Sequence, residues 1–394
     1  MPKPPVIKLF LFVGFVWAAI VGPLSHVLIM QSIGATSSQI GVFTAICAVI
    51  NMVFQPVWGL LSDKIGSPRK VICFCLGASS VFFGSVLFAD SITVTAVLLI
   101  TEAIFRSSII SLLDSHTLSE ISAIPRLQYS HIRLAGSIFY GGLSIIYSGV
   151  INTWGVMAII PISICICAGA ILWGLFASKG QWENSSLLAG GHDTLHAHTV
   201  KHNIKKEVLS LLRNKKFIVF IIHAAFTSLA TQPAFVFIVF YVTQVGGHTG
   251  DVPMIQGLRC VIEIPIFILI GSMGKFVSAK KLMLAGLCFS FVYLTGLYVS
   301  NTLFSLTIFH LIGSPGFILC LSGRMWFLNE ITPINVRSTS ITIMVACEIA
   351  LGAVLGNMIA GRILGAFETQ ALTLVALTSL FIALITLFLI PRKD

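Results

Sequence analysis

Ionisable side chains occur inside long apolar runs of the sequence. In the first half, Glu102 and Arg106 are four residues apart, and Asp114 follows two turns further along the same run. If the run crosses a membrane, a charge near its centre costs about 2.5–3.5 kcal/mol, so each charge needs a partner or a function. Glu102 and Arg106 can pair on one helix face, whereas Asp114 has no oppositely charged residue within a turn.

Other polar residues lie in neighbouring apolar runs. Arg133 begins the run after Asp114, so the two side chains can face each other across a cavity. Tyr140 lies seven residues beyond Arg133, on the same helix face. Gln232, which precedes Pro233 in the second half, is a candidate hydrogen-bonding group.

The second half also carries charges inside apolar runs. Arg259 and Glu263 are four residues apart, and His310 and Glu348 lie in two later runs. A carboxyl group in an apolar environment can gain and lose a proton near neutral pH. Proton binding is therefore one chemistry that these residues can perform, and a buried histidine that only makes a helix contact is the alternative for His310.

The sequence contains no motif for covalent catalysis or nucleotide hydrolysis. We find no phosphate-binding Gly-x-x-x-x-Gly-Lys-Ser/Thr loop, no serine-centred elbow and no metalloprotease motif. We therefore expect a protein that is not an enzyme and has no cofactor. Four histidines between residues 192 and 202 have the spacing of metal ligands, but a solvated linker explains them, and we expect no metal site.

Composition indicates that these residues belong to a membrane protein. Of the 394 residues, 56% are hydrophobic and only 10% are charged, and the mean hydropathy is +0.98. A soluble domain has about 25% charged residues. The net charge of +10 lies in short gaps between apolar runs, which is typical of cytoplasmic loops and argues against nucleic acid as a partner.

Twelve apolar runs are long enough to cross a bilayer as helices. They cover residues 7–30, 38–61, 70–89, 92–116, 130–151, 155–177, 216–242, 252–273, 281–300, 302–323, 336–360 and 367–390. We predict an all-α protein with an N-terminal six-helix bundle (1–177), a cytoplasmic linker (178–215) and a C-terminal six-helix bundle (216–394). Lys and Arg concentrate in the even-numbered gaps and at both ends, which predicts that both termini are cytoplasmic.

A charged joint follows the second predicted span. The segment "GLLSDKIGSPRK" combines two glycines with four charged residues, and its defining positions are Gly59, Asp63, Lys64, Gly66, Arg69 and Lys70. A tight joint of this kind can act as a conformational latch between helices, and a simple topology marker is the alternative. Altered copies of "GLLSDKIGSPRKV" and "LSEISAI" recur about 210 residues later, as "GSMGKFVSAKKL" and "LNEITPI", which indicates duplicated halves in parallel orientation.

This joint resembles the signature loop of the major facilitator superfamily of transporters. "FQPVWGLLSDKIG" is similar to the lactose permease branch, and "LLDSHTLSE" with "YSHIRLAGSIFYG" resembles that branch and the phenylpropionate permease-like branch. "IEIPIFILIG" and "YLTGLYVSN" are similar to sugar efflux transporters. The resemblance implies a transporter in the inner membrane of a bacterium, surrounded by lipid and functional as a monomer. Its two bundles would rock to give a small-molecule substrate alternating access to the two sides of the membrane.

The resemblance also implies roles for single residues. Asp114 and Arg133 match the acidic residue and the arginine that bind sugar hydroxyls in the lactose permease, and Tyr140 matches its stacking tryptophan. A carboxylate and a guanidinium give charge-assisted hydrogen bonds to a polyol, while an aromatic ring covers its apolar side. Because the guanidinium can equally bind a carboxylate, sugar and acid both remain open. Arg106 is a further candidate substrate ligand, with a structural ion pair to Glu102 as the alternative.

The proton-carrying residue of the lactose permease has no counterpart here. "FHLIGSP" resembles the corresponding segment and places His310 on its histidine, but Gly313 stands at the position of the proton-carrying glutamate. Glu263 and Glu348 are the expected substitutes if protons are the coupling ion. We prefer Glu263, because Arg259 one turn away would favour its deprotonation.

Taken with the residues above, the resemblance predicts a proton-coupled transporter of a sugar or a sugar-like polyol. Transport of a small aromatic or aliphatic carboxylate and efflux of amphipathic drugs are the alternatives. A signalling or scaffold membrane protein is a different class, but it would have no reason to bear the cost of charges inside both halves.

Overall fold

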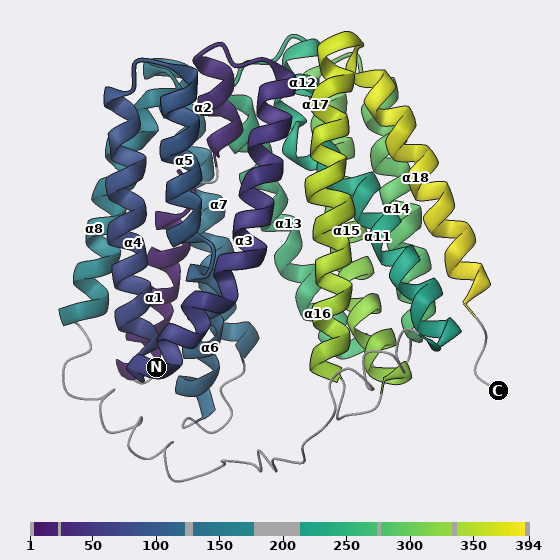
Figure 1. Cartoon of the computed structure of the whole chain (residues 1–394), viewed down its shortest axis with the longest axis horizontal. Helices are drawn as coiled ribbons and strands as arrows, with labels where there is room; N and C mark the ends of the chain where they lie inside the picture. The colour runs from purple at the N-terminus through teal and green to yellow at the C-terminus, as the bar shows by residue number, and fades with distance from the viewer. Residues whose placement is uncertain are drawn as a thin grey trace. The chain divides into compact units, whose positions relative to one another are not determined.

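The computed structural model describes residues 4–22, 25–122, 129–176, 213–273, 277–332 and 337–390. Every regular element among these residues is a helix (Figure 1). The prediction of an all-α protein is therefore confirmed. Most of the predicted linker 178–215, including its histidines, lies outside the described residues, as do Arg126 and the last four residues.

The helices of the first half are α1 (Pro4–Ala19), α2 (His26–Ser32), α3 (Ser37–Ile65), α4 (Pro68–Ser85), α5 (Ile92–Arg106), α6 (Ile109–Ser122), α7 (Tyr129–Trp154) and α8 (Ile159–Phe176), with short 3-10 turns η2 (Val86–Phe88) and η3 (Val156–Ala158). Those of the second half are α11 (Lys215–Val236), α12 (Ile238–Gln244), α13 (Asp251–Met273), α14 (Ala279–Val299), α15 (Leu303–Ile331), α16 (Arg337–Glu348), η5 (Ile349–Gly356), α17 (Asn357–Ala366) and α18 (Thr369–Leu389).

Ten helical segments of the described chain are long and apolar enough to cross a membrane. They are 37–65, 68–88, 92–121, 131–154, 156–176, 215–236, 279–299, 303–331, 339–366 and 369–389. The protein is therefore a multi-pass membrane protein. The first and eighth predicted spans correspond to α1 with α2 and to α13, so the number of twelve spans remains a prediction.

The chain forms two compact units by its internal contacts. Unit 1 comprises 1–34, 50–200 and 256–261, and unit 2 comprises 35–49, 201–255 and 262–394. The first part of α3 therefore groups with unit 2 and a short part of α13 groups with unit 1. The predicted bundles are each continuous in sequence. They therefore do not include the assignment of residues 35–49 to unit 2 and of residues 256–261 to unit 1.

The core of unit 1 lies where α1 packs against α7 and α8, and α4 packs against α5 and α8. Its buried apolar side chains come from several helices that are distant in sequence; they include Phe12, Val16, Ile72, Leu76, Leu113, Ala135 and Ala170. Burial of these side chains packs α1, α6 and α7 against one another, and α6 and α7 carry Asp114, Arg133 and Tyr140.

Small residues set the closest helix contacts of unit 2. A side chain at Gly286 of α14 would meet the backbone of α15 at Gly316 and Cys320, and one at Gly323 would meet Met283. On another face, a side chain at Gly41 of α3 would lie 2.6 Å from the Asn357 carbonyl oxygen and 3.0 Å from Gly361. Small residues let membrane helices approach closely, so these glycines position the helices of the unit.

Several predicted spans are interrupted in their interior. The first breaks between α1 and α2, the fourth breaks at Ser107 and Ser108 between α5 and α6, and the eleventh contains the π-helical segment η5. A Cβ atom at Gly352 of η5 would overlap Ser228 of α11, so the backbone of η5 lies directly against that helix. Interrupted helices and π-helical turns are found where a span lines a functional site.

Candidate functional site

The tryptophan Trp17 connects two of the predicted substrate residues. The guanidinium carbon of Arg133 lies 4.0 Å from the centre of the Trp17 ring, which is a cation–π distance. The rings of Trp17 and Tyr140 are nearly perpendicular, with centroids 6.1 Å apart. Space for this contact exists because Gly136 has no side chain: a Cβ there would lie 2.6 Å from both Arg133 and Trp17.

The carboxylate of Asp114 is held beside this group. The Tyr129 hydroxyl donates a hydrogen bond of 2.7 Å to Asp114 Oδ1, and the charge of Arg133 acts on the same carboxylate. The structure thus brings Asp114, Arg133 and Tyr140 into one unit and adds Trp17 and Tyr129, which the sequence did not indicate. Gln232 lies half-buried in α11.

The indole nitrogen Nε1 of Trp17 is buried and makes no hydrogen bond within the described residues. A buried donor without a partner costs about 1–3 kcal/mol. An acceptor supplied by a ligand would remove that cost. The arrangement therefore offers a cationic fork, an aromatic face and an unused donor to a polar molecule.

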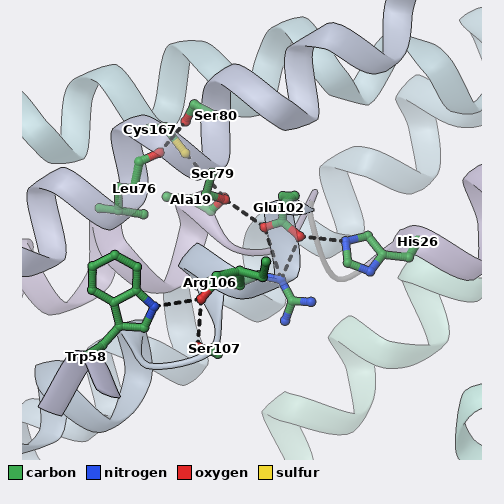
Figure 2. Close-up of polar contacts among 11 residues, drawn as sticks. Ala19, His26, Trp58, Leu76, Ser79, Ser80, Glu102, Arg106, Ser107 and Cys167 are labelled. Carbon is green, nitrogen blue, oxygen red and sulfur yellow. Dashed lines mark hydrogen bonds and ion pairs between the residues drawn. The ribbon is translucent and has the colours of Figure 1, made fainter. Parts of the chain in front are cut away.

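Arg106 and Glu102 form the predicted ion pair. Arg106 Nε lies 3.2 Å from both carboxylate oxygens of Glu102. The Ser79 hydroxyl donates to Oε1 at 2.7 Å, and His26 Nε2 lies 3.1 Å from Oε2 (Figure 2). The pair is thus part of a four-residue polar cluster, and two of its members come from other helices.

A buried ion pair in unit 2 joins Glu348 to Arg324. Arg324 Nη1 lies 3.3 Å from Glu348 Oε1, and the side chains are 6% and 16% exposed. Arg324 lies one residue beyond the predicted span, which ended at residue 323, whereas α15 continues to Ile331. The Ser228 hydroxyl of α11 donates to the backbone carbonyl of Glu348 at 3.0 Å, directly before η5 begins.

His310 is enclosed by aromatic rings. Its ring is edge-on to Tyr293, with centroids 5.4 Å apart, and parallel to Phe235 at 6.3 Å. A Cβ at Gly313 would lie 2.9 Å from the Tyr293 ring. Tyr293 therefore occupies the space that a larger residue at position 313 would need.

Arg259 and Glu263 lie one turn apart on α13, and both side chains are half-buried. Their predicted roles in proton coupling remain predictions.

The charged joint adopts a tight turn between α3 and α4. Gly66 has a φ of 68°, and its N–H donates to the Ser62 carbonyl oxygen at 2.9 Å, which ends α3. Pro68 then begins α4. Asp63, Lys64 and Lys70 are exposed. A Cβ at Gly59 would meet no atom of the described residues within 4 Å, so this glycine is not required for a close helix contact there.

Arg69 of this joint is the residue whose charge reaches α6. Its charge acts on Glu120 and on His116. Glu120 belongs to the "LSEISAI" segment that recurs in the second half. The two repeated segments, which are separate in sequence, thus interact in unit 1.

The family model for the MFS_1 like family matches residues 6–375. The chain belongs to this family. It is therefore a membrane transporter of the major facilitator type and not an enzyme, and the resemblance found in the sequence is confirmed. An uncharacterized transporter of Bacillus subtilis (strain 168), YwbF, is 24% identical over 350 residues, which cover 86% of this chain and 81% of that protein.

Solved structures of transporters share the fold. The nucleoside transporter NupG matches with a TM-score of 0.78 at 13% identity, over 100% of both chains. The D-xylose–proton symporter matches with a TM-score of 0.70 at 12% identity, over 98% of this chain and 97% of that one. The peptide transporter POT in complex with alafosfalin matches with a TM-score of 0.71 at 10% identity, over 98% and 94%. Because the named substrates differ, the fold alone does not select one.

Proposed function

We propose that this transporter moves a sugar or a sugar-like polyol across the inner membrane of a bacterium, and that protons drive the movement. In this proposal the chain is a monomer of twelve spans in two bundles with both termini in the cytoplasm. The observation that carries the substrate class is the group formed by Trp17, Arg133 and Tyr140 with Asp114 beside it.

The chemistry of this group suits a hydroxylated ring. Arg133 and Asp114 supply ionised donors and acceptors, and hydrogen bonds to ionised groups are roughly twice as strong as neutral ones. Trp17 and Tyr140 present aromatic faces to the apolar side of a sugar. The unused Trp17 N–H adds one further donor, which a hydroxyl oxygen can accept.

One observation favours a carboxylate as the second candidate substrate. Among the described residues, no ion pair at contact distance neutralises Arg133, which stacks on Trp17 instead. A carboxylate would complete a bidentate pair with the guanidinium. Efflux of amphipathic drugs is a weaker alternative. The charged side chains of Arg133 and Asp114 form directional hydrogen bonds, which suit a polar substrate better than an amphipathic one.

We propose that Glu348 or Glu263 carries the coupled proton. Glu348 is half-buried next to Arg324, whose positive charge can hold the carboxylate ionised when no proton is bound. Glu263 has Arg259 one turn away on the same helix. His310 supplies an imidazole close to Tyr293 and is a candidate relay.

Transport by purified protein in vesicles tests the function. A panel of radiolabelled sugars, nucleosides and small carboxylates is offered with an imposed proton gradient, and both uphill uptake and substrate exchange are measured. We expect uphill uptake of a sugar. Uptake of carboxylates alone would replace the polyol proposal by its alternative, and absence of any uptake or exchange would contradict both.

The coupling residues are tested in the same vesicles. Glutamine mimics a permanently protonated glutamate, so Glu263→Gln, Glu348→Gln or the double variant should lose uphill uptake and keep exchange. Exposed Glu368→Gln is the control. A double variant that still concentrates substrate with a proton gradient alone would exclude both carboxylates.

A further inference from the structure

The polar cluster around Glu102 contains more groups than a structural ion pair needs. Glu102 is fully buried, with an exposed fraction of 0%. Arg106 of α5 alone would neutralise its charge. Yet Ser79 of α4 and His26 of α2 also contact the carboxylate, so that three helices converge on it (Figure 2).

The histidine gives this cluster a variable charge. Arg106 stays protonated at all relevant pH values, so the Glu102–Arg106 pair contributes no net charge. Histidine is the side chain whose charge changes most readily near neutral pH. The cluster is therefore neutral when His26 is neutral and carries one positive charge when His26 binds a proton.

Two helix interruptions lie next to the cluster. His26 is the first residue of α2, immediately after the break that follows α1, and Arg106 is the last residue of α5, immediately before the break at Ser107 and Ser108. At the first break, a Cβ at Gly22 would overlap Ser163, so the chain there lies directly against α8. Irregular backbone inside a span is tolerated where it is buried in protein or lines a water-filled cavity.

We propose that His26 and Glu102 form a proton-binding site in unit 1, separate from the candidate carboxylates of unit 2. His26 Nε2 lies 3.1 Å from Glu102 Oε2. The incoming proton forms a bond with the lone pair of the ring nitrogen that carries no hydrogen, which converts the imidazole to an imidazolium beside the carboxylate. Glu102 remains ionised between the imidazolium and Arg106, and release of that proton reverses the step.

The neighbours of the carboxylate favour a proton over a metal cation. Arg106 and His26 lie within 3.2 Å of the carboxylate oxygens, and Ser79 uses its hydroxyl as a donor to Oε1. A sodium ion would meet two donors with positive character where it needs oxygen ligands. The Cys167 thiol of α8 is the next titratable group near Glu102, and η3, which packs on α2, has no titratable residue.

The proton itself is the probe in the first experiment. The full-length protein is purified in detergent with ¹³Cε1-labelled histidine, and the histidine resonances are recorded from pH 5 to pH 9. Loss of one resonance in His26→Gln assigns His26; this variant keeps the Glu102–Arg106 pair and should fold. We expect His26 to titrate reversibly by one proton in this range, and Glu102→Gln to remove that titration from it.

Controls separate this effect from a general change of the protein. His223 is also fully buried, and within the described residues its ring hydrogen-bonds through Nδ1 to the Ala383 carbonyl oxygen at 2.8 Å and to no carboxylate, so its resonance should not respond to Glu102→Gln. Exposed Glu368→Gln should leave His26 unchanged. If Glu102→Gln does not fold, Ser79→Ala removes one hydrogen bond to the carboxylate and should still displace the titration midpoint of His26. A wild-type His26 that stays in one charge state, or titrates identically in the Glu102 and Ser79 variants, overturns the proposal.

The second experiment asks whether this proton is coupled to transport, and this step rests on the proposed function. With a substrate from the vesicle panel, His26→Gln should keep exchange but lose the pH dependence of exchange that the wild type shows. A purely structural role predicts an equal loss of exchange at every pH, which would overturn coupling. If the panel yields no substrate, the proposed function fails, while the titration of His26 still decides whether the site exists.

Discussion

The contact between Arg133 and Trp17 is the most specific feature at the scale of single residues. Arg133→Lys keeps the charge but loses the planar fork and most of the stacking. A cation–π contact contributes about 0.5–2 kcal/mol, and about 1.4 kcal/mol corresponds to a factor of ten in affinity. We therefore expect substrate affinity to fall about tenfold in Arg133→Lys, as measured by concentration dependence of exchange.

Exposed Arg362 of α17 offers a matched control for this substitution. Arg362→Lys should leave the affinity unchanged. Equal and small effects of the two variants would remove Arg133 from the substrate site.

The Arg324–Glu348 pair permits a double-mutant test of stability. Removal of one partner of a buried ion pair leaves an uncompensated charge and costs about 3–5 kcal/mol, whereas removal of both is often nearly neutral. Arg324→Gln and Glu348→Gln should each lower the thermal unfolding midpoint strongly, and the double variant should recover much of the loss. Additive losses in the double variant would show that the two groups are stabilised independently.

At this scale, side-chain contacts can be predicted from the sequence only when the two residues are close in the chain. The Glu102–Arg106 pair follows from a spacing of four residues on a helix. His26, Ser79 and Trp17 reach their partners only through packing of α2, α4 and α1, and no local pattern indicates that packing. Arg324 directly follows Gly323, where the predicted span ended, and could have been found by extending the span, because Met325, Trp326, Phe327 and Leu328 continue the apolar run.

At the scale of elements, the joint between α3 and α4 carries an acidic residue, Asp63, at the C-terminal end of a helix, where a negative charge is electrostatically unfavourable. Asp63 lies in the last turn of α3, where the helix dipole disfavours a negative charge. An interaction with the positive end of another helix in a different conformation would offset this. We expect Asp63→Asn to slow transport severalfold without changing expression or substrate affinity, as measured by initial rates in vesicles.

Asp90 provides the comparison for this variant. It is exposed in the segment between η2 and α5 and lies outside the repeated joint. Asp90→Asn should leave the rate unchanged. A well-expressed Asp63→Asn protein with a wild-type rate would contradict the latch and leave the joint as a topology marker.

The apolar runs predict helix positions well and helix interruptions poorly. α4, α8, α14 and α18 lie close to their predicted ranges, because composition and length suffice to identify an uninterrupted apolar helix. The break at Ser107 and the π-helical segment η5 lie in runs that look continuous. In each case neighbouring helices, rather than local propensity, decide the backbone conformation.

At the scale of the whole molecule, the distribution of Lys and Arg predicts which side of the membrane each loop occupies. In a chain whose nine native cysteines are replaced, Ser186→Cys tests the linker and Asn301→Cys tests the segment between α14 and α15. An impermeant maleimide should label Asn301→Cys in intact cells and Ser186→Cys only after permeabilisation. The reverse pattern would invert the predicted topology, and labelling of both in intact cells would contradict the odd number of spans predicted between them.

The π-helical segment η5 has a consequence for the side-chain directions of the helix that follows it. A π turn closes its hydrogen bond over five residues where an α turn uses four, so the segment accommodates a residue that an uninterrupted helix would lack. Each residue of an α-helix turns the side-chain direction by about 100°. The direction in which Gly361 faces Gly41 therefore depends on η5, and deletion of one residue between Glu348 and Asn357 should turn Gly361 about 100° away from Gly41.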